Sequence, residues 1–215
     1  MKVVHNHIYL KKERIIFCCL PKVANTSIKF AISEAKKLKK HPVNIHQHPY
    51  FQNRTLHSLA AIHSLRQKVP DLLMIAIVRN PFARLASCWR SKMWKSPLRM
   101  PELNVPLRCS FEKFAKAVCK QKDINSNMHY RSQHFGMFFK DKFLPTHWYR
   151  LENLTPAWKE IQSLSASRGL ILPDIKHTNR SGVKNWRNHY TQEIYQSVRK
   201  RFQRDLNLFY PIAFC

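Results

Sequence analysis

Residues 21–27, PKVANTS, combine side chains that bind phosphate. They follow an apolar run and precede an amphipathic stretch, so we expect them to connect a buried strand to a helix. The backbone N–H groups and the dipole at a helix N-terminus attract anions. Lys22 adds a positive charge, and Thr26 and Ser27 add hydroxyl donors. The segment therefore predicts an anion site of the phosphate-loop kind.

This loop differs from the phosphate loop of nucleoside triphosphatases. It has none of the glycines of the G-x-x-x-x-G-K-[ST] signature, and no Lys-Ser/Thr pair. Without that pair the sequence offers no obvious magnesium ligand. Hydrolysis of ATP or GTP is therefore disfavoured, whereas phosphate binding as such is not.

A second polar segment, RNPFARLASCWRSKM, begins at Arg79 after the apolar run 72–78. Asn80 suits a helix N-cap and Pro81 the first helical position. Ser87 follows Arg79 by eight residues, about two helical turns, so both side chains can reach one anion. Arg84 is a further candidate, with an ion pair to an acidic residue as the alternative. Two anion sites fit a ligand with two separate phosphates better than a linear triphosphate.

The elements that must position these residues follow an alternating pattern. Residues 14–20 and 72–78 read as buried strands, each followed by a polar turn and a helix, and a third strand is expected to end near Arg150. This order predicts an α/β fold, a P-loop-like three-layer sandwich with a central parallel sheet flanked by helices. We expect a single domain over residues 1–215, with ligands at the C-terminal ends of the strands. Further helices are expected at 28–38, 56–67, 111–120, from a Thr155 cap onward, and 190–202, with a loop at 41–56.

Charge limits the classes of partner. The 215 residues include 38 Lys and Arg against 12 Asp and Glu, a formal net charge of +26, which attracts polyanions. A hydrophobic share of 44% is typical of a globular chain. No apolar run reaches the about 20 residues that span a bilayer, and no signal-peptide pattern is present. We therefore expect a cytoplasmic protein as written; a domain excised from a longer secreted or Golgi-lumenal protein is the alternative.

The six cysteines and 12 histidines show no metal-binding spacing, so we expect no metal. Cys18 and Cys19 lie in an expected strand and read as small core residues. Cys109 and Cys119 are a pair that could form a disulfide in a secreted chain, and the sequence leaves this open. Two N-glycosylation sequons, at residues 25–27 and 179–181, fall on expected ligand loops and are interpreted as chance matches.

Both polar segments resemble those of the sulfotransferase family. LPKVANTSIK resembles its 5′-phosphosulfate-binding loop, above all in the carbohydrate group (chondroitin-, dermatan- and heparan-type enzymes of the Golgi, and bacterial relatives). IVRNPFARLASCWRSKM resembles its 3′-phosphate-binding segment. NMHYRSQ, YRLENL and WRNHYTQEIYQSVRKRFQRDLNLFYP are similar to later blocks, so the resemblance extends from residue 14 to residue 211.

The resemblance implies a donor, 3′-phosphoadenosine 5′-phosphosulfate (PAPS), and as acceptor a hydroxyl, of a carbohydrate or an acidic glycan, without a metal. Lys22 would stabilise charge on the departing 5′-phosphate, and Arg79 and Ser87 would bind the 3′-phosphate. Many members have glycine or a small residue where Asn25 stands; because Asn tolerates left-handed angles, we expect the turn to survive. The donor-binding residues would be Pro21, Lys22, Val23, Ala24, Asn25, Thr26 and Ser27 around the 5′-phosphate, and Arg180, Ser181 and Lys184 in a late loop over the nucleotide.

Sulfuryl transfer also needs a base for the proton of the acceptor hydroxyl, and histidine titrates in the right range. His57 stands much where heparan-sulfate 2-O-type members have a catalytic histidine, although chondroitin-type members do not keep one there. His129, in a family-like block, is the rival, and His48 is a third candidate.

Two other functions remain open from the sequence. A basic nucleic-acid-binding protein without catalytic activity would use the net charge and interleaved aromatic residues such as Trp89, Trp94 and Trp186, but no nucleic-acid-binding signature is present, and we expect no nucleic-acid partner. A nucleotide kinase is disfavoured by the missing triphosphatase signature. Neither the acceptor nor the oligomeric state can be read from the sequence.

Overall fold

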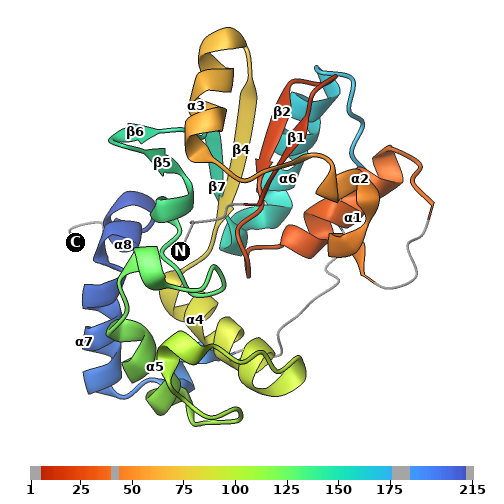
Figure 1. Ribbon diagram of the computed structural model, residues 1–215. Helices are drawn as coiled ribbons and strands as arrows, with labels where there is room; N and C mark the ends of the chain where they lie inside the picture. The colour runs from red at the N-terminus through yellow and green to blue at the C-terminus, as the bar shows by residue number, and fades with distance from the viewer. Residues whose placement is uncertain (1–5, 40–43, 176–184, 212–215) are drawn as a thin grey trace. The chain divides into compact units, whose positions relative to one another are not determined.

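A computed structural model describes residues 6–39, 44–175 and 185–211 (Figure 1). The chain divides into two compact units. Of the described residues, 6–39, 44–78 and 136–175 form the sheet unit, and 79–135 and 185–211 form the helical unit. The expected single domain over residues 1–215 stays a prediction. No helix in the described part of the chain is long and apolar enough to cross a membrane.

The sheet unit contains a mixed sheet of five strands in the order β3-β1-β2-β4-β7. The three strands β2, β4 and β7 are parallel, and β1 runs antiparallel to both of its neighbours. Every residue of β2 and β4 is buried, as expected for continuous apolar strands in a parallel sheet. The predicted α/β sandwich is thus confirmed, with an antiparallel edge added. The strands are β1 His7–Leu10, β2 Ile15–Cys18, β3 Thr55–Leu56, β4 Leu73–Val78 and β7 His147–Arg150.

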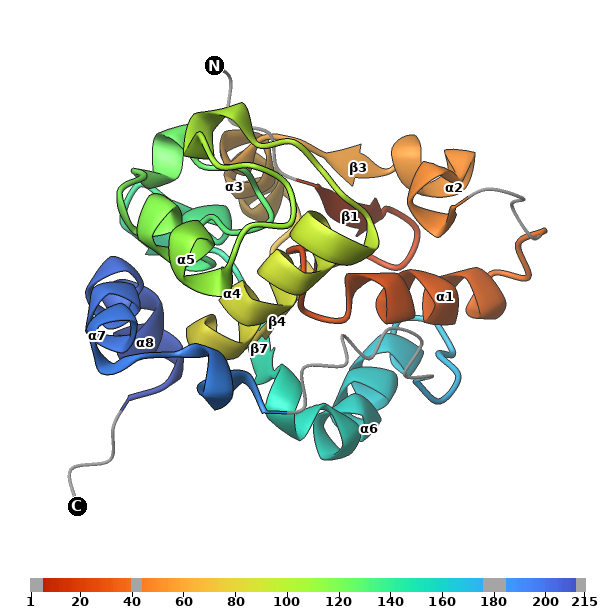
Figure 2. The same cartoon turned by 90° about the horizontal axis from the view of Figure 1, so that it is seen from below.

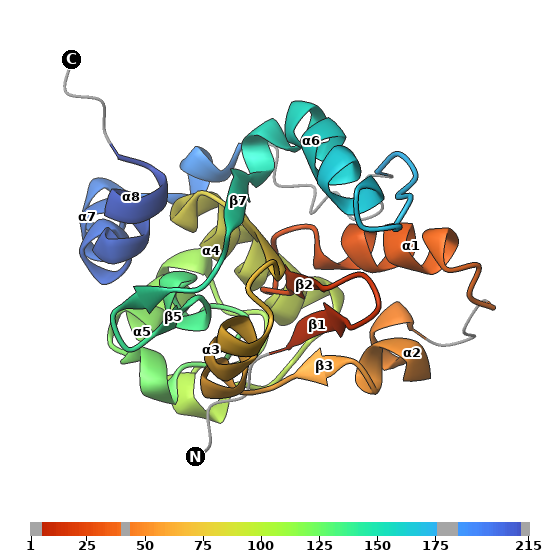
Figure 3. The ribbon, with the colours of Figure 1, turned by 90° about the horizontal axis from the view of Figure 1, so that it is seen from above.

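Helices cover both faces of this sheet. Figures 2 and 3 show α1 and α6 on one face and α3 on the other. The helices of the unit are α1 Asn25–Ala35, α2 Pro49–Gln52, α3 Leu59–Lys68 and α6 Leu154–Ala166; β5 Phe138–Phe139 and β6 Lys142–Phe143 form a separate hairpin.

Two local predictions in this unit are wrong. The stretch expected as a loop, 41–56, contains α2 and β3, because His48 caps α2 through its ring nitrogen and Pro49 occupies the first helical turn. The expected Thr155 cap is also wrong. Helix α6 begins at Leu154 directly after a 3-10 turn, so its N-cap residue is Asn153, which makes no side-chain capping bond.

The helical unit packs four helices around aromatic side chains. The Phe82 ring stacks on Tyr195 with centroids 4.4 Å apart, and Phe114 is fully buried. The last long helix begins after a Thr191 cap, so Tyr190 precedes it. The helices are α4 Pro81–Trp89, continued by a π-helical turn Arg90–Lys95, α5 Phe111–Cys119, α7 Gln192–Arg201 and α8 Gln203–Phe209. Short 3-10 turns lie at Ile45–Gln47, Pro101–Leu103, Asp123–Asn125, His134–Gly136, Leu151–Asn153 and Trp186–His189.

Candidate active site

The loop between β2 and α1 turns sharply without glycine. Lys22 has φ 70° and Ala24 has φ 64°, both in the left-handed region. The turn survives as expected, but not through left-handed angles at Asn25, because Asn25 is already the first residue of α1. A left-handed conformation costs a non-glycine residue roughly 1–2 kcal/mol, so the surrounding fold must hold Lys22 and Ala24 in place. Turns of this kind direct successive N–H groups toward one side and form anion-binding concavities.

The N-terminus of α1 follows this turn directly. Its N-cap residue, Ala24, has no side chain that can cap, and the first turn carries no acidic residue. The first N–H groups of an α-helix have no partner within the helix, and the helix dipole adds a partial positive charge there. The predicted phosphate loop therefore has the local geometry and the charge of an anion site.

Two polar side chains at this helix start have unusual surroundings. The Thr26 hydroxyl oxygen lies 3.0 Å from His46 Nε2. Asn25 Oδ1 is buried and has no hydrogen-bond partner among the described residues. Sequence patterns do not single out His46, because it follows Thr26 by twenty positions in a segment expected to be a loop.

The second predicted segment links β4 to α4. Asn80 caps α4 as expected: its Oδ1 accepts from the N–H groups of Phe82 and Ala83 at 3.0 and 3.3 Å. Arg79 stands between the strand and this cap. Ser87 lies on α4 with 2% of its surface exposed.

The Arg84 side chain is bound to the main chain of a neighbouring loop. Its guanidinium donates to the carbonyl oxygens of Arg131 (2.7 Å) and Met128 (3.2 Å). Burial lowers the pKa of Arg84, and the nearby Asp205 acts in the opposite direction. The geometry thus gives Arg84 the task of holding a neighbouring loop through main-chain carbonyls.

The predicted donor-binding residues fall into three groups. Residues 21–27 belong to the sheet unit, and Arg79 and Ser87 belong to the helical unit. Arg180, Ser181 and Lys184 lie outside the described residues.

The three candidate bases differ in their surroundings. His57 is exposed and directly precedes Ser58, the N-cap of α3. His129 Nδ1 lies 2.7 Å from Asn127 Oδ1, which can only accept, so Nδ1 is the donor in this contact. His48 Nδ1 accepts from Tyr50 N–H, and its Nε2 faces the carbonyl of Lys39. Both nitrogens of His48 therefore serve the fold, which disfavours it as a base.

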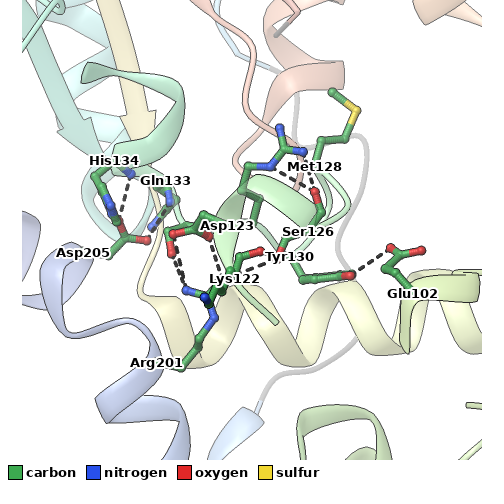
Figure 4. Close-up of polar contacts among 12 residues, drawn as sticks. Glu102, Lys122, Asp123, Ser126, Met128, Tyr130, Gln133, His134, Arg201 and Asp205 are labelled. Carbon is green, nitrogen blue, oxygen red and sulfur yellow. Dashed lines mark hydrogen bonds and ion pairs between the residues drawn. The ribbon is translucent and has the colours of Figure 1, made fainter. Parts of the chain in front are cut away.

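A partly buried polar network in the helical unit was not expected from the sequence (Figure 4). Arg201 donates to Asp123 (2.6 Å) and to the Ser132 hydroxyl (2.9 Å). Burial alone would raise the pKa of Asp123, but Arg201 and Ser132 together hold it below its usual value. Nearby, the fully buried Asp205 accepts from two successive backbone N–H groups. No local pattern marks these residues, because their partners lie far away in the chain.

A basic hollow of about 620 Å³ lies in the sheet unit. The turn between β1 and β2, which forms part of it, is at the opposite end of β2 from the phosphate loop. Arg54 covers the Tyr50 ring at 3.9 Å, and Lys36 is paired with Glu13. The hollow is lined by Lys11, Lys12, Glu13, Lys36, Tyr50 and Arg54.

The cysteines of the described residues are free thiols. Cys18 and Cys19 are buried in and beside β2, as expected for small core residues, and burial raises the pKa of Cys19 to about 12. Cys109 and Cys119 are both unpaired. Among the described residues, no group of three or more His, Cys, Asp or Glu side chains is placed to hold a metal ion.

Comparison with known proteins identifies the family. Searches of curated proteins and of solved structures gave no significant match. A family model described as "Sulfotransferase family" matches residues 5–211 and so includes both predicted phosphate-binding segments. The chain therefore belongs to the sulfotransferase family, whose chemistry is sulfuryl transfer.

Proposed function

We propose that this enzyme transfers the sulfuryl group of PAPS to a hydroxyl of a carbohydrate, with a histidine as base. The observation that carries the proposal is the β2–α1 loop. It combines two left-handed residues, a helix N-terminus without acidic residues, and Lys22. This is an anion site without the magnesium-binding pair of a triphosphatase, and it suits the 5′-phosphosulfate end of the donor.

Each residue has a distinct task in this proposal. Backbone N–H groups of residues 24–27 hold the 5′-phosphate, and Lys22 stabilises the charge that develops on it as the S–O bond breaks. Arg79 and Ser87 bind the 3′-phosphate. Arg180, Ser181 and Lys184 are proposed to contribute to donor binding, as the resemblance implies.

The acceptor hydroxyl attacks sulfur in line with the departing phosphate, and its proton passes to a histidine. His57 is the first candidate, because its ring is exposed at the start of α3 and can meet an acceptor from solvent. His129 is the second, because it lies in a block similar to that of the family. A carbohydrate acceptor agrees with the resemblance of both loops to the carbohydrate group and with the net charge of +26, which attracts acidic glycans.

Direct binding of the desulfated product tests the donor assignment. We expect 3′-phosphoadenosine 5′-phosphate to raise the melting temperature of the protein and to bind more tightly than adenosine 5′-phosphate, because only the former has a group for Arg79. No stabilisation at a millimolar concentration of the product would contradict the donor assignment.

A glycan panel tests the acceptor. The enzyme is incubated with PAPS and neutral or acidic oligosaccharides, and each product is examined for the mass added by one sulfate. We expect transfer to one class of sugar without added metal. Transfer to a non-carbohydrate hydroxyl alone would retain the sulfotransferase reaction and remove the carbohydrate acceptor.

A further inference from the structure

Gln133 makes a two-way contact with the main chain of Arg79. Its side-chain oxygen accepts from the Arg79 N–H at 2.8 Å, and its side-chain nitrogen donates to the Arg79 carbonyl at 2.9 Å. Gln133 has 0% of its surface exposed. The two hydrogen bonds are therefore partly shielded from water.

An amide suits this task for a chemical reason. The Asn and Gln side chains present a donor and an acceptor side by side in one plane, and Arg79 has both kinds of main-chain group to satisfy. It stands after the end of β4 and before the Asn80 cap of α4. Main-chain polar groups shielded from water need hydrogen-bond partners, and Gln133 supplies one for each of these two groups of Arg79.

Gln133 is itself anchored by a buried carboxylate from α8 (Figure 4). Asp205 accepts from Gln133 N–H at 2.7 Å and from His134 N–H at 2.8 Å, and His134 Nδ1 lies 2.7 Å from the same carboxylate. Asp205 is 0% exposed. Three hydrogen bonds to one carboxylate hold Gln133 and His134 in a fixed position.

The two residues before Gln133 are held by other helices. Arg84 from α4 donates to the carbonyl of Arg131, and Arg201 from α7 donates to the hydroxyl of Ser132. This stretch forms neither helix nor strand, so side chains supply the order that a regular element would supply.

We propose that Gln133, anchored by Asp205, is a positioning residue for Arg79. It fixes the main chain from which the Arg79 guanidinium extends, and so sets the direction in which this side chain reaches the 3′-phosphate. The inference rests on the proposed function, in which Arg79 binds that phosphate. Preorganised groups bind more tightly because less freedom is lost on binding, so the effect of Gln133 should be confined to the 3′-phosphate.

The test compares two nucleotides that differ only in that phosphate. Dissociation constants of 3′-phosphoadenosine 5′-phosphate and adenosine 5′-phosphate are measured by titration calorimetry, and their ratio gives the preference for the 3′-phosphate. We expect Gln133→Met to lower this preference by about tenfold, as the removal of both hydrogen bonds implies. The affinity for adenosine 5′-phosphate should change by less than about twofold, and its binding stoichiometry reports the folded fraction.

A double-mutant cycle with Arg79→Ala separates positioning from general destabilisation. In the Arg79→Ala protein, Gln133→Met should change the preference no further. Equal weakening of both nucleotides by Gln133→Met, or the same loss of preference in the Arg79→Ala background, would overturn the inference. If Gln133→Met does not fold, Gln133→Glu, which keeps an acceptor for Arg79 N–H and loses the donor, is read in the same way.

The cycle also distinguishes this inference from the proposed function. If Arg79→Ala abolishes the preference and Gln133→Met or Gln133→Glu retains it, the positioning role is wrong and the role of Arg79 stands. If the unaltered protein shows no preference for the 3′-phosphate, the proposed role of Arg79 and the positioning role both fall.

Discussion

Lys22 occupies a position where the fold tolerates an unfavourable backbone conformation (φ 70°). We expect Lys22→Ala to lower the turnover number by about 10²–10³, the usual effect of removing one preorganised charge-stabilising group. The free energy of unfolding should fall little, because alanine has similar difficulty with a left-handed conformation. Initial rates at saturating PAPS, together with denaturant unfolding, measure both effects.

Lys68→Ala is the matched control for this substitution. Lys68 is an exposed lysine at the end of α3, outside the basic hollow. It removes the same charge from the same unit, so its turnover number should stay within about twofold of the unaltered enzyme. Equal losses in the two variants would mean that Lys22 acts through net charge rather than through the reacting group.

The choice between His57 and His129 can be made from the pH dependence of the rate. A general base works in its neutral form, so the rate should fall as pH drops and the ring becomes protonated. Replacing the true base by alanine should lower the turnover number by about 10²–10⁴ and remove this acidic limb. Replacing the other histidine should leave the limb in place.

We expect His57→Ala to have the larger effect, because the His57 ring is exposed, whereas the His129 ring is half-buried and bonded to Asn127. The pH profile of kcat, from about pH 5 to pH 9 around the usual histidine pKa, is the measurement. Two variants that both keep the acidic limb would exclude both residues as the base.

At the scale of elements, the turn into α1 is held by packing rather than by its own sequence. Ala24 adopts φ 64°, ψ 16°, which glycine would adopt without strain. We expect Ala24→Gly to raise the free energy of unfolding by about 0.5–1 kcal/mol, because relief of strain exceeds the entropy that glycine adds to the unfolded chain. Denaturant unfolding measures the change.

Ala31→Gly provides the control within the same helix. Ala31 is a buried residue of α1, where glycine lowers the free energy of unfolding by about 1 kcal/mol. The two substitutions are chemically identical and should have opposite signs. Destabilisation by both would show that Ala24 is not strained in the protein.

The elements that the sequence predicted are those with local causes. Buried strands β2 and β4 follow from continuous apolar runs, and the start of α4 follows from the cap chemistry of Asn80. Strands β1 and β3 were not predicted, since they form through pairing with each other and with β2.

The candidate site also has features that the local sequence predicts and features that depend on distant parts of the chain. Residue types alone pointed to the loop that carries Lys22, and its role in donor binding stays a prediction. The left-handed residues of the loop, and the hydrogen bonds between Gln133 and Arg79 across 54 positions, depend on tertiary structure. A sequence records the kinds of groups available, whereas long-range contacts decide which of them the fold fixes in place.

At the scale of the whole molecule, the net charge of +26 predicts salt-dependent binding to acidic polymers. Part of the attraction for an acidic polymer depends on the total charge of the protein, and part depends on local sites where several cations lie close together. The hollow lined by Lys11, Lys12 and Arg54 is such a place, and none of these three forms an ion pair with an acidic side chain within the described ranges. One face of its Tyr50 ring is covered by Arg54, which leaves less aromatic surface for stacking a nucleic-acid base.

We therefore expect the hollow to contribute to binding of an acidic polysaccharide. The test variant carries Lys11→Gln, Lys12→Gln and Arg54→Gln. The control carries Lys68→Gln, Lys120→Gln and Arg199→Gln, an equal loss of charge from exposed positions elsewhere.

Binding of a heparin oligosaccharide is measured at several salt concentrations, and the slope of log K against log salt falls by about one for each cation that no longer pairs with an anionic group of the polymer. A local site lowers the slope in the hollow variant by about two to three and in the control by less than about one. Equal slopes in the two variants would mean that the affinity comes from the total charge of the protein and not from a local site. Both variants lose the same charge, so only a site where cations converge can make the slope depend on which positions are substituted.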